Sequence, residues 1–194
     1  MTLEQLLKHK PAASFTAQEL SGKAFWRLQR GEHHAAHLLF EAACARARET
    51  GETWRCHRNR AATALFDSGA IAQALPRVHE VLDDYEAHPE ARDDRHWVEH
   101  ATQRLHRLAY QEQPASFETR YRELTARASR IQGRSSPWIH PFQEELLGFA
   151  RELGLKAIAR ELIEVIAARR PMPRALRRRL DELERWAKSP GSLA

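Results

Sequence analysis

The chain has 194 residues, of which 42% are hydrophobic and 29% are charged, so it can build a packed core and wholesale disorder is excluded. Alanine (31) and leucine (22) are abundant, whereas valine and isoleucine together number ten, which argues against a large β-sheet. The net charge of +5 fits nucleic acid, an anionic lipid surface or an acidic protein as a partner. Because most of the 26 arginines alternate with Asp and Glu, solvated helix faces are the favoured explanation for them.

The sequence also predicts a cytoplasmic location. Cys44 and Cys56 do not form a C-x-x-C pair, and two separate thiols are typical of a reducing compartment. The first ten residues lack the apolar stretch of a signal peptide. No segment approaches the roughly 20 apolar residues that a membrane-spanning helix needs. Heavy use of Arg and Ala is typical of a GC-rich bacterial genome.

Helix start and stop signals are frequent along the chain. Thr16 and Glu19 form a capping box at the start of one helix, and Gly31 ends that helix. Further along, Ser136 and Pro137 are a typical N-cap and first helical residue. The predicted helices cover 2–9, 16–30, 34–48, 53–68, 71–86, 93–111, 114–132, 137–154, 156–168 and 174–188.

A repeating pattern surrounds three glycines. The residue five places after each glycine is alanine. Apolar residues also recur seven places before the glycine and nine and twelve places after it. Glycine closes a tight turn between antiparallel helices, and the alanine lets the second helix approach the first. The positions are Ala24, Gly31, Ala36, Phe40 and Ala43; Ala62, Gly69, Ala74, Val78 and Val81; Leu147, Gly154, Ala159, Ile163 and Ile166. A further copy fits between the second and third, with Leu105, Phe117, Tyr121 and Leu124, but it has Glu112 in place of the glycine.

This pattern resembles the tetratricopeptide repeat family, in the longer variety found in bacterial regulators and signalling adaptors. The likeness covers 16–168, although the copies are farther apart than the family's usual spacing of about 34 residues. The family's aromatic residue in the first helix is absent from the first two copies, which have Leu20 and Arg58 there. The resemblance implies a single all-α domain, a right-handed superhelical array of about four antiparallel helix pairs. An N-terminal helix and linker (1–15) precede the pairs, and a capping helix (173–188) closes them. A generic helical bundle is the alternative.

The resemblance further implies a non-catalytic module that binds a protein or peptide partner in a concave groove lined by the first helix of each pair. Aromatic, amide and basic side chains on these helices can fill pockets or hydrogen-bond a peptide. The candidate partner-binding residues are Phe25, Gln29, Asn59, Arg60, Thr63, His106, Tyr110 and Arg151. The family's two-carboxylate clamp needs Lys and Asn in the first copy, where this chain has Ser21 and Phe25, so that clamp is not expected. Plain helix surface is the alternative for each residue.

Binding of RNA or DNA is the main alternative function. Basic residues cluster in two places, Arg55, Arg58 and Arg60, and Arg169, Arg170, Arg174, Arg177, Arg178 and Arg179. Trp54 and Trp186 each adjoin an arginine and could stack on bases. However, Asp181 and Glu182 follow the second cluster at i, i+4 spacing, so a solvated capping helix explains that cluster more simply.

Metal and catalytic sites have little support in the sequence. Two histidine pairs at i, i+4 spacing can each share a helix face, namely His33/His37 and His96/His100. Since no third ligand follows from the spacing, we expect no metal and no cofactor, and a metal-dependent hydrolase is the weakest alternative. No nucleophile elbow, Walker loop or dinucleotide-binding motif is present, so no enzymatic activity is predicted. An unsealed end of the array, with Trp138 or Phe142, could support a homodimer.

Overall fold

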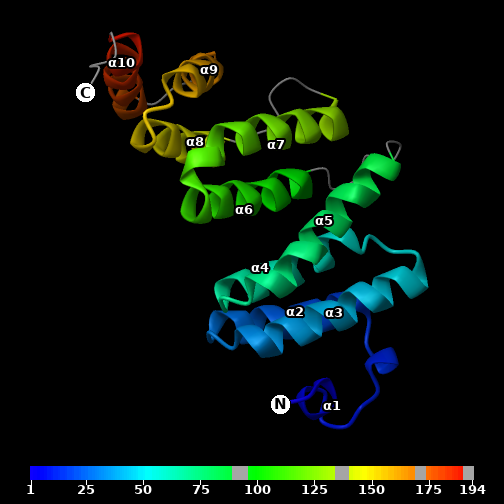
Figure 1. The fold of residues 1–194 in the computed structure, drawn as a ribbon. Coiled ribbons are helices and arrows are strands. Elements are labelled where there is room, and N and C mark those ends of the chain that lie inside the picture. Colours follow the sequence, from blue (N-terminus) through cyan, green and yellow to red (C-terminus); the bar gives the residue numbers. More distant parts are fainter. Residues whose placement is uncertain (89–95, 134–139, 169–173, 190–194) are drawn as a thin grey trace. The chain divides into compact units, whose positions relative to one another are not determined.

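The computed structural model describes residues 1–88, 96–133, 140–168 and 174–189 (Figure 1). Within these ranges the regular secondary structure is helical and contains no strand, which confirms the predicted all-α fold. The elements are α1 (Leu3–Leu6), η1 (Ala12–Ser14), α2 (Ala17–Gln29), α3 (His33–Thr50), α4 (Arg55–Asp67), α5 (Ile71–Ala87), α6 (His96–Glu112), η2 (Pro114–Ser116), α7 (Phe117–Gln132), α8 (His140–Glu152), α9 (Lys156–Ala167) and α10 (Arg174–Lys188). The bounds of α2 to α10 follow the predicted ones closely.

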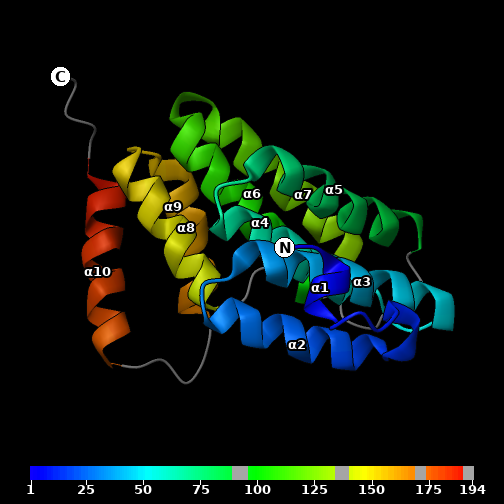
Figure 2. The same cartoon turned by 90° about the horizontal axis from the view of Figure 1, so that it is seen from below.

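The chain divides into two compact units, Met1–Ala101 and Thr102–Ala194, and each is described by itself. The first unit holds α1 to α5 and the start of α6, and the second holds the rest of α6 and the later helices. In the first unit α3 packs against both α2 and α4, and α4 packs against α5. Figures 1 and 2 both show α2 and α3 side by side. In the second unit α9 packs against both α8 and α10. From α2 to α5 and from α8 to α10, each helix therefore packs against the next one along the chain, as helical hairpins require.

The three glycines of the repeat close turns of the same shape. Gly31, Gly69 and Gly154 have φ angles of 71°, 78° and 68°, in the left-handed region where a Cβ is unfavourable. The residue after each glycine donates its N–H to the carbonyl oxygen five residues earlier, at 3.0, 2.9 and 2.8 Å respectively. This hydrogen bond is the closure of a Schellman motif, which satisfies carbonyl groups at the end of a helix. The predicted position of the three glycines, between paired helices, is confirmed.

The apolar residues that recur around these glycines all lie in the core. None of the twelve is more than 5% exposed, and the alanines five places after each glycine are completely buried. Alanine at this point lets the second helix approach the first closely, while the larger residue four places further on fills the space behind it. The positions that recur in the sequence around each glycine are therefore also the buried positions in all three copies.

The pair formed by α6 and α7 has a different turn, as its sequence predicts. The turn residue Gln113 has a φ of −139°, and the 3-10 helix Pro114–Ser116 comes before α7. The two helices nevertheless pack through rings, because the centre of the His106 ring lies 5.5 Å from that of Tyr121. Aromatic side chains of α6 and α7 are therefore in contact although the turn between the helices has no left-handed glycine.

Alanine gives α3 its central position in the first unit. This helix has neighbours on two sides, and a small side chain lets both approach. Its buried residues are Ala35, Ala36, His37, Leu39, Phe40, Ala42, Ala43, Cys44 and Ala47. Several of these residues, including Leu39 and Phe40, form one apolar cluster with Leu20 and Ala24 from α2 and with Ala61 and Ala64 from α4. One apolar core therefore joins three consecutive helices.

The two ends of the chain are covered differently. The predicted helix at 2–9 is shorter in the structure, where α1 ends at Leu6 and the φ angles of Lys8 and His9 are 51° and 61°. Its buried residue is Leu7, which packs into the core of the first unit. At the other end, α10 packs against α9 through Leu180 and Leu183, as predicted for a capping helix.

We predict that Gly69→Ala lowers the free energy of unfolding by about 1–2 kcal/mol, because the left-handed conformation strains any L side chain. Gly22 in α2 is the matched control, since an added Cβ has no atom within 4 Å at either position. Gly22→Ala should raise stability by up to about 1 kcal/mol, because alanine favours a helix interior. Urea unfolding followed by circular dichroism measures both, and a loss of similar size in the two variants would contradict the turn assignment.

Candidate partner-binding surface

Three helices meet around the side chain of Arg60. Its guanidinium carbon lies 4.7 Å from the ring centre of Phe25 on α2 and 4.9 Å from that of Trp97 on α6. The Nη1 atom also donates to the Ser21 hydroxyl oxygen at 3.4 Å. Side chains from α2, α4 and α6 therefore meet at one point. Trp97 is the member that sequence reasoning missed, although it directly follows His96, which was considered and set aside as a metal ligand.

Phe25 is held firmly although it is accessible. Its side chain is 39% exposed, and its ring makes an edge-to-face contact with the buried ring of Phe40 at a centroid distance of 5.3 Å and an angle of 87°. An exposed aromatic ring that a core residue holds in place loses little conformational entropy when a ligand binds. Phe25 is therefore a preformed contact rather than a side chain that must be ordered.

A hollow of about 330 Å³ lies beside Arg60. Its lining residues are Gln18, Ser21, Gly22, Phe25, Glu52, His57 and Arg60. Among them one arginine and one glutamate are charged at neutral pH, and the carboxylate of Glu52 accepts a hydrogen bond from the Thr50 hydroxyl at 2.7 Å. The hollow thus combines aromatic surface, a cation and polar groups in a volume that fits one or two amino-acid side chains.

A second hollow, of about 470 Å³, borders α2 on the side of α1 and α3. Its lining residues are Leu6, Lys8, Gly22, Lys23, Trp26, Arg27 and Leu39. Trp26 is 51% exposed, and the guanidinium carbons of Arg27 and Arg30 lie 4.9 and 4.5 Å from its ring centre. Both arginines also pair with Glu32, at 2.5 and 2.8 Å, so they share one carboxylate that balances one of their two charges.

The other predicted residues of the first unit are less accessible or lie apart from the hollow. Gln29 is exposed but does not line the hollow. Asn59 is only 1% exposed, so its side chain belongs to the core. Thr63 is half-buried, and its hydroxyl donates to the carbonyl oxygen of Asn59 at 2.9 Å. The structure therefore brings together Phe25 and Arg60 from the predicted set.

The predicted residues of the second unit are mostly engaged within it. His106 is completely buried among the rings of Phe117, Tyr121 and Phe142, with centroid distances between 5.5 and 6.3 Å. Burial lowers the pKa of His106 to about 3, so its ring is neutral at physiological pH. This core position gives His106 no accessible atoms, which sequence periodicity alone could not show.

Of the two remaining predicted residues, Tyr110 is engaged in contacts within the second unit, whereas Arg151 is accessible. The ring of Tyr110 stacks on Phe149 at a centroid distance of 4.2 Å, and its hydroxyl donates to the carboxylate of Glu152. That hydrogen bond raises the pKa of Tyr110. Arg151 is exposed on α8. Phe142, which the sequence suggested for a dimer contact, is only 1% exposed and is not available to a second copy, whereas Trp138 lies outside the described residues.

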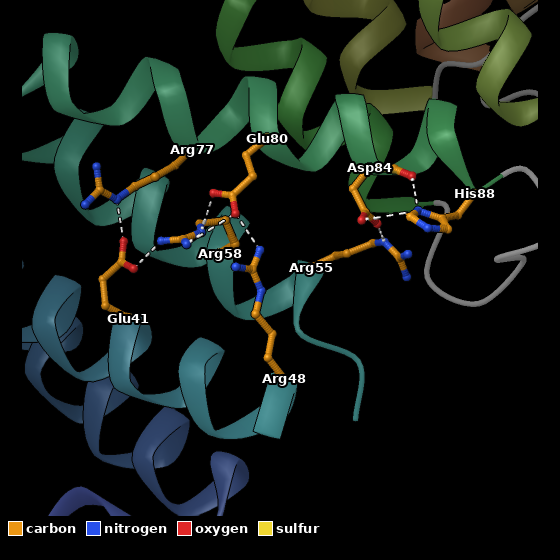
Figure 3. Close-up of polar contacts among 8 residues, drawn as sticks. All are labelled: Glu41, Arg48, Arg55, Arg58, Arg77, Glu80, Asp84 and His88. Atoms are coloured by element: carbon orange, nitrogen blue, oxygen red, sulfur yellow. Dashed lines mark hydrogen bonds and ion pairs between the residues drawn. The ribbon is translucent and has the colours of Figure 1, made fainter. Parts of the chain in front are cut away.

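Two of the three arginines in the first cluster, Arg55 and Arg58, pair with carboxylates within the protein. Arg58 pairs with Glu41 and Glu80, and Arg55 pairs with Asp84, as Figure 3 shows. The network extends across three helices, because Arg77 of α5 also pairs with Glu41 and Arg48 of α3 pairs with Glu80 (Figure 3). The ring of Trp54 is likewise covered, with the Arg48 guanidinium carbon 3.7 Å from its centre. The ion pairs reduce the positive charge that Arg55 and Arg58 offer to a nucleic acid.

The second cluster is only partly described. Arg169 and Arg170 lie outside the described residues. The cluster members on α10, Arg174, Arg177, Arg178 and Arg179, are exposed, and so is Arg185 on the same helix. Arg179 lies 3.7 Å from Glu144 of α8. The described part of this cluster is therefore an accessible basic surface.

The candidates for metal binding and catalysis do not assemble a site in the described ranges. No group of three or more His, Cys, Asp or Glu side chains there is arranged to hold a metal ion. The side chain of His96 is outside the description, and Nδ1 of His37 lies 3.9 Å from the Glu41 carboxylate. Cys44 is buried, and this burial raises the pKa of its thiol to about 11, so the thiol stays protonated.

Two further observations bear on the class of protein. Among the described helices, none combines the length and the apolar character required to span a bilayer.

Comparison of the chain with protein-family models, curated proteins and solved structures finds no match in any of the three. The function must therefore be argued from the residues themselves.

We predict that Glu41→Gln lowers the free energy of unfolding by about 1–3 kcal/mol, because two half-buried arginines lose their shared carboxylate. Glu49→Gln is the control, since Glu49 pairs with Arg46 at an exposed position, where a pair contributes less than about 0.5 kcal/mol. Urea unfolding measures both. Equal losses would show that the network in Figure 3 adds no more than surface pairs do.

We also predict that His106 makes the protein sensitive to acid. Its pKa is lowered from 6.5 to about 3 by burial, so below pH 6.5 the unfolded chain binds a proton that the folded protein does not. Stability is therefore full above pH 6.5 and falls by about 1.4 kcal/mol per pH unit as the pH drops toward 3. In urea titrations, His106→Phe should reduce the slope of unfolding free energy against pH by about 1.4 kcal/mol per pH unit between pH 6 and pH 4. The same slope in both proteins would place the acid sensitivity in other groups.

Proposed function

We propose that this protein is a non-catalytic interaction module that binds a segment of a partner protein on the surface around Arg60. The observation that supports the proposal is the arrangement of Arg60 beside two aromatic rings, at the edge of a hollow of about 330 Å³. Arginine and aromatic residues are the side chains most often responsible for binding energy in protein interfaces. A partner segment could place one side chain in the hollow and run along α2 and α4.

Preorganisation makes this surface suitable for recognition. The ring of Phe25 is fixed by Phe40, and Arg60 on α4 contacts two other helices, α2 and α6. A side chain that is already ordered does not lose its rotamer freedom on binding, which otherwise costs about 0.5–1.5 kcal/mol for each long side chain. A groove formed by stacked helix pairs would likewise present side chains that are already ordered before the partner binds.

The non-catalytic part of the proposal is supported by the state of the two most obvious chemical groups. Cys44 is a buried thiol whose pKa is raised to about 11, and His106 is a buried neutral ring. A nucleophile needs an accessible thiolate, and a general base needs access to its substrate. Neither group meets its requirement.

We further infer that the chain is a tetratricopeptide-like array of helix pairs. Support comes from three turns with the same glycine conformation and the same closing hydrogen bond, and from the burial of the whole repeating register. The right-handed superhelix and the concave groove are parts of this inference. The cytoplasmic location rests on the two free cysteines, Cys44 and Cys56.

Nucleic-acid binding is the second candidate, because five arginines on α10 are exposed. Binding of this kind would depend on phosphate contacts and would weaken steeply as salt increases. The cluster around Arg58 does not favour it, since carboxylates of the same unit pair with Arg55 and Arg58. The test below separates the two candidates by the arginine that each requires.

We predict that Arg60→Glu abolishes capture of the native partner from cell extract, while Arg178→Glu leaves it intact. Both changes reverse one charge, but Arg60 lines the hollow and Arg178 lies on the exposed face of α10. Capture is read by mass spectrometry with and without nuclease, and melting temperatures control for folding. A truncated arginine at the centre of an interface typically costs 2 kcal/mol or more, or about 30-fold in affinity.

The opposite pattern would favour the second candidate. Capture that nuclease removes, and that depends on Arg178 rather than Arg60, indicates nucleic acid as the direct ligand. A large loss of melting temperature in Arg60→Glu would instead assign Arg60 a structural role, and Phe25→Ala then tests the same surface without a change in charge.

A further inference from the structure

Among the described residues of its unit, Arg60 is the arginine without a carboxylate partner. Seven other arginines lie in the described part of Met1–Ala101, and each has an Asp or Glu oxygen within 4.0 Å. They are Arg27, Arg30, Arg46, Arg48, Arg55, Arg58 and Arg77. Among the described residues no Asp or Glu lies at that distance from Arg60, whose contacts are the two rings and the Ser21 hydroxyl.

We propose that Arg60 binds the carboxylate of an Asp or Glu side chain in the partner segment, and that the neighbouring apolar side chain of that segment enters the hollow. This inference rests on the proposed function and names the chemistry that the partner must present. A half-buried guanidinium gains most from a carboxylate, because charge-assisted hydrogen bonds are about twice as strong as neutral ones. Every other arginine in the described part of this unit already has such a partner.

The aromatic rings prepare the guanidinium for this contact. A ring face attracts the cation but offers no hydrogen-bond acceptor, so the N–H groups in the guanidinium plane stay available to an incoming carboxylate. The hydrogen bond to Ser21, at 3.4 Å, is long and uses only Nη1. The rings thus fix the position of the charge while leaving its donors for the ligand.

The hollow favours a carboxylate over a phosphate. Arg60 is the one cation that is permanently charged among its lining residues, and Glu52 places a negative charge in the same hollow. A phosphate carries more charge than a carboxylate and is usually held by several cations or backbone N–H groups. A single carboxylate balances Arg60 alone, and Phe25 provides the apolar contact for its neighbour.

The experiment selects random eight-residue peptides on the intact chain. The peptides are displayed as N-terminal fusions, so they have no free terminal carboxylate and any acidic preference comes from side chains. Selection is repeated on Arg60→Gln and on the matched control Arg178→Gln. We expect enrichment of Asp or Glu next to an apolar residue with the wild type and the control, and loss of the acidic preference with Arg60→Gln.

A double-mutant cycle then tests the contact itself. The best peptide is synthesised with an amidated C-terminus, together with its version in which Asn or Gln replaces the acidic residue. Each single change, in the peptide or at Arg60, should weaken binding at least about tenfold, and the two together should cost little more than either one. Additive losses would show that Arg60 and the acidic residue do not touch, and would overturn the inference.

The remaining outcomes separate this inference from the proposed function. Selected peptides that lack an acidic preference but lose affinity in Phe25→Ala would overturn the carboxylate contact and leave the interaction surface in place. Absence of any selected peptide, with native capture also insensitive to Arg60→Glu, would overturn both. Tight binding of a twelve-residue oligo(dT) that Arg60→Gln removes and peptides cannot compete for would assign the surface to nucleic acid and likewise overturn both.

Discussion

The left-handed glycine turn is the constraint on which the rest of this structure depends. A helix that ends in this turn must leave in a direction that brings the following helix back alongside it, and the hydrogen bond across the turn fixes where that helix starts. Once the start is fixed, the residue five places after the glycine always faces the preceding helix. Alanine is therefore required there, because a larger side chain would push the two backbones apart. The three copies of this arrangement, at Gly31, Gly69 and Gly154, determine which residues become core.

Apolar packing and ion pairs then have different roles in this fold. Alanine-rich contacts set the distance between α3 and its two neighbours, and apolar burial supplies most of the stability. The ion pairs around Glu41 and Glu80 lie at the border of that core and link α3, α4 and α5 by directional contacts. Such pairs add less free energy than the apolar core does, but they specify how neighbouring helices are rotated. The many arginines of this chain are thus mostly components of the fold.

The sequence was sufficient for the fold wherever local rules decide the structure. Caps, glycines and helical periodicity located the helices, and the repeat located the turns, because these features act over a few residues. The candidate site was harder to predict. Phe25 and Arg60 were found from their place on the first helices, but Asn59 and His106 occupy the same kind of position and are buried. Trp97 was missed because its contact with Arg60 joins residues far apart in the chain.

The contact of Arg60 with two rings has a mechanical consequence. It links α2, α4 and the first turn of α6 at a single point, so any change in the tilt between these helices must pull one of the rings away from the guanidinium. The three side chains therefore act as a spacer that keeps the helices in one mutual orientation before any ligand arrives. A ligand that bound this orientation and no other would favour it over any alternative tilt of the three helices.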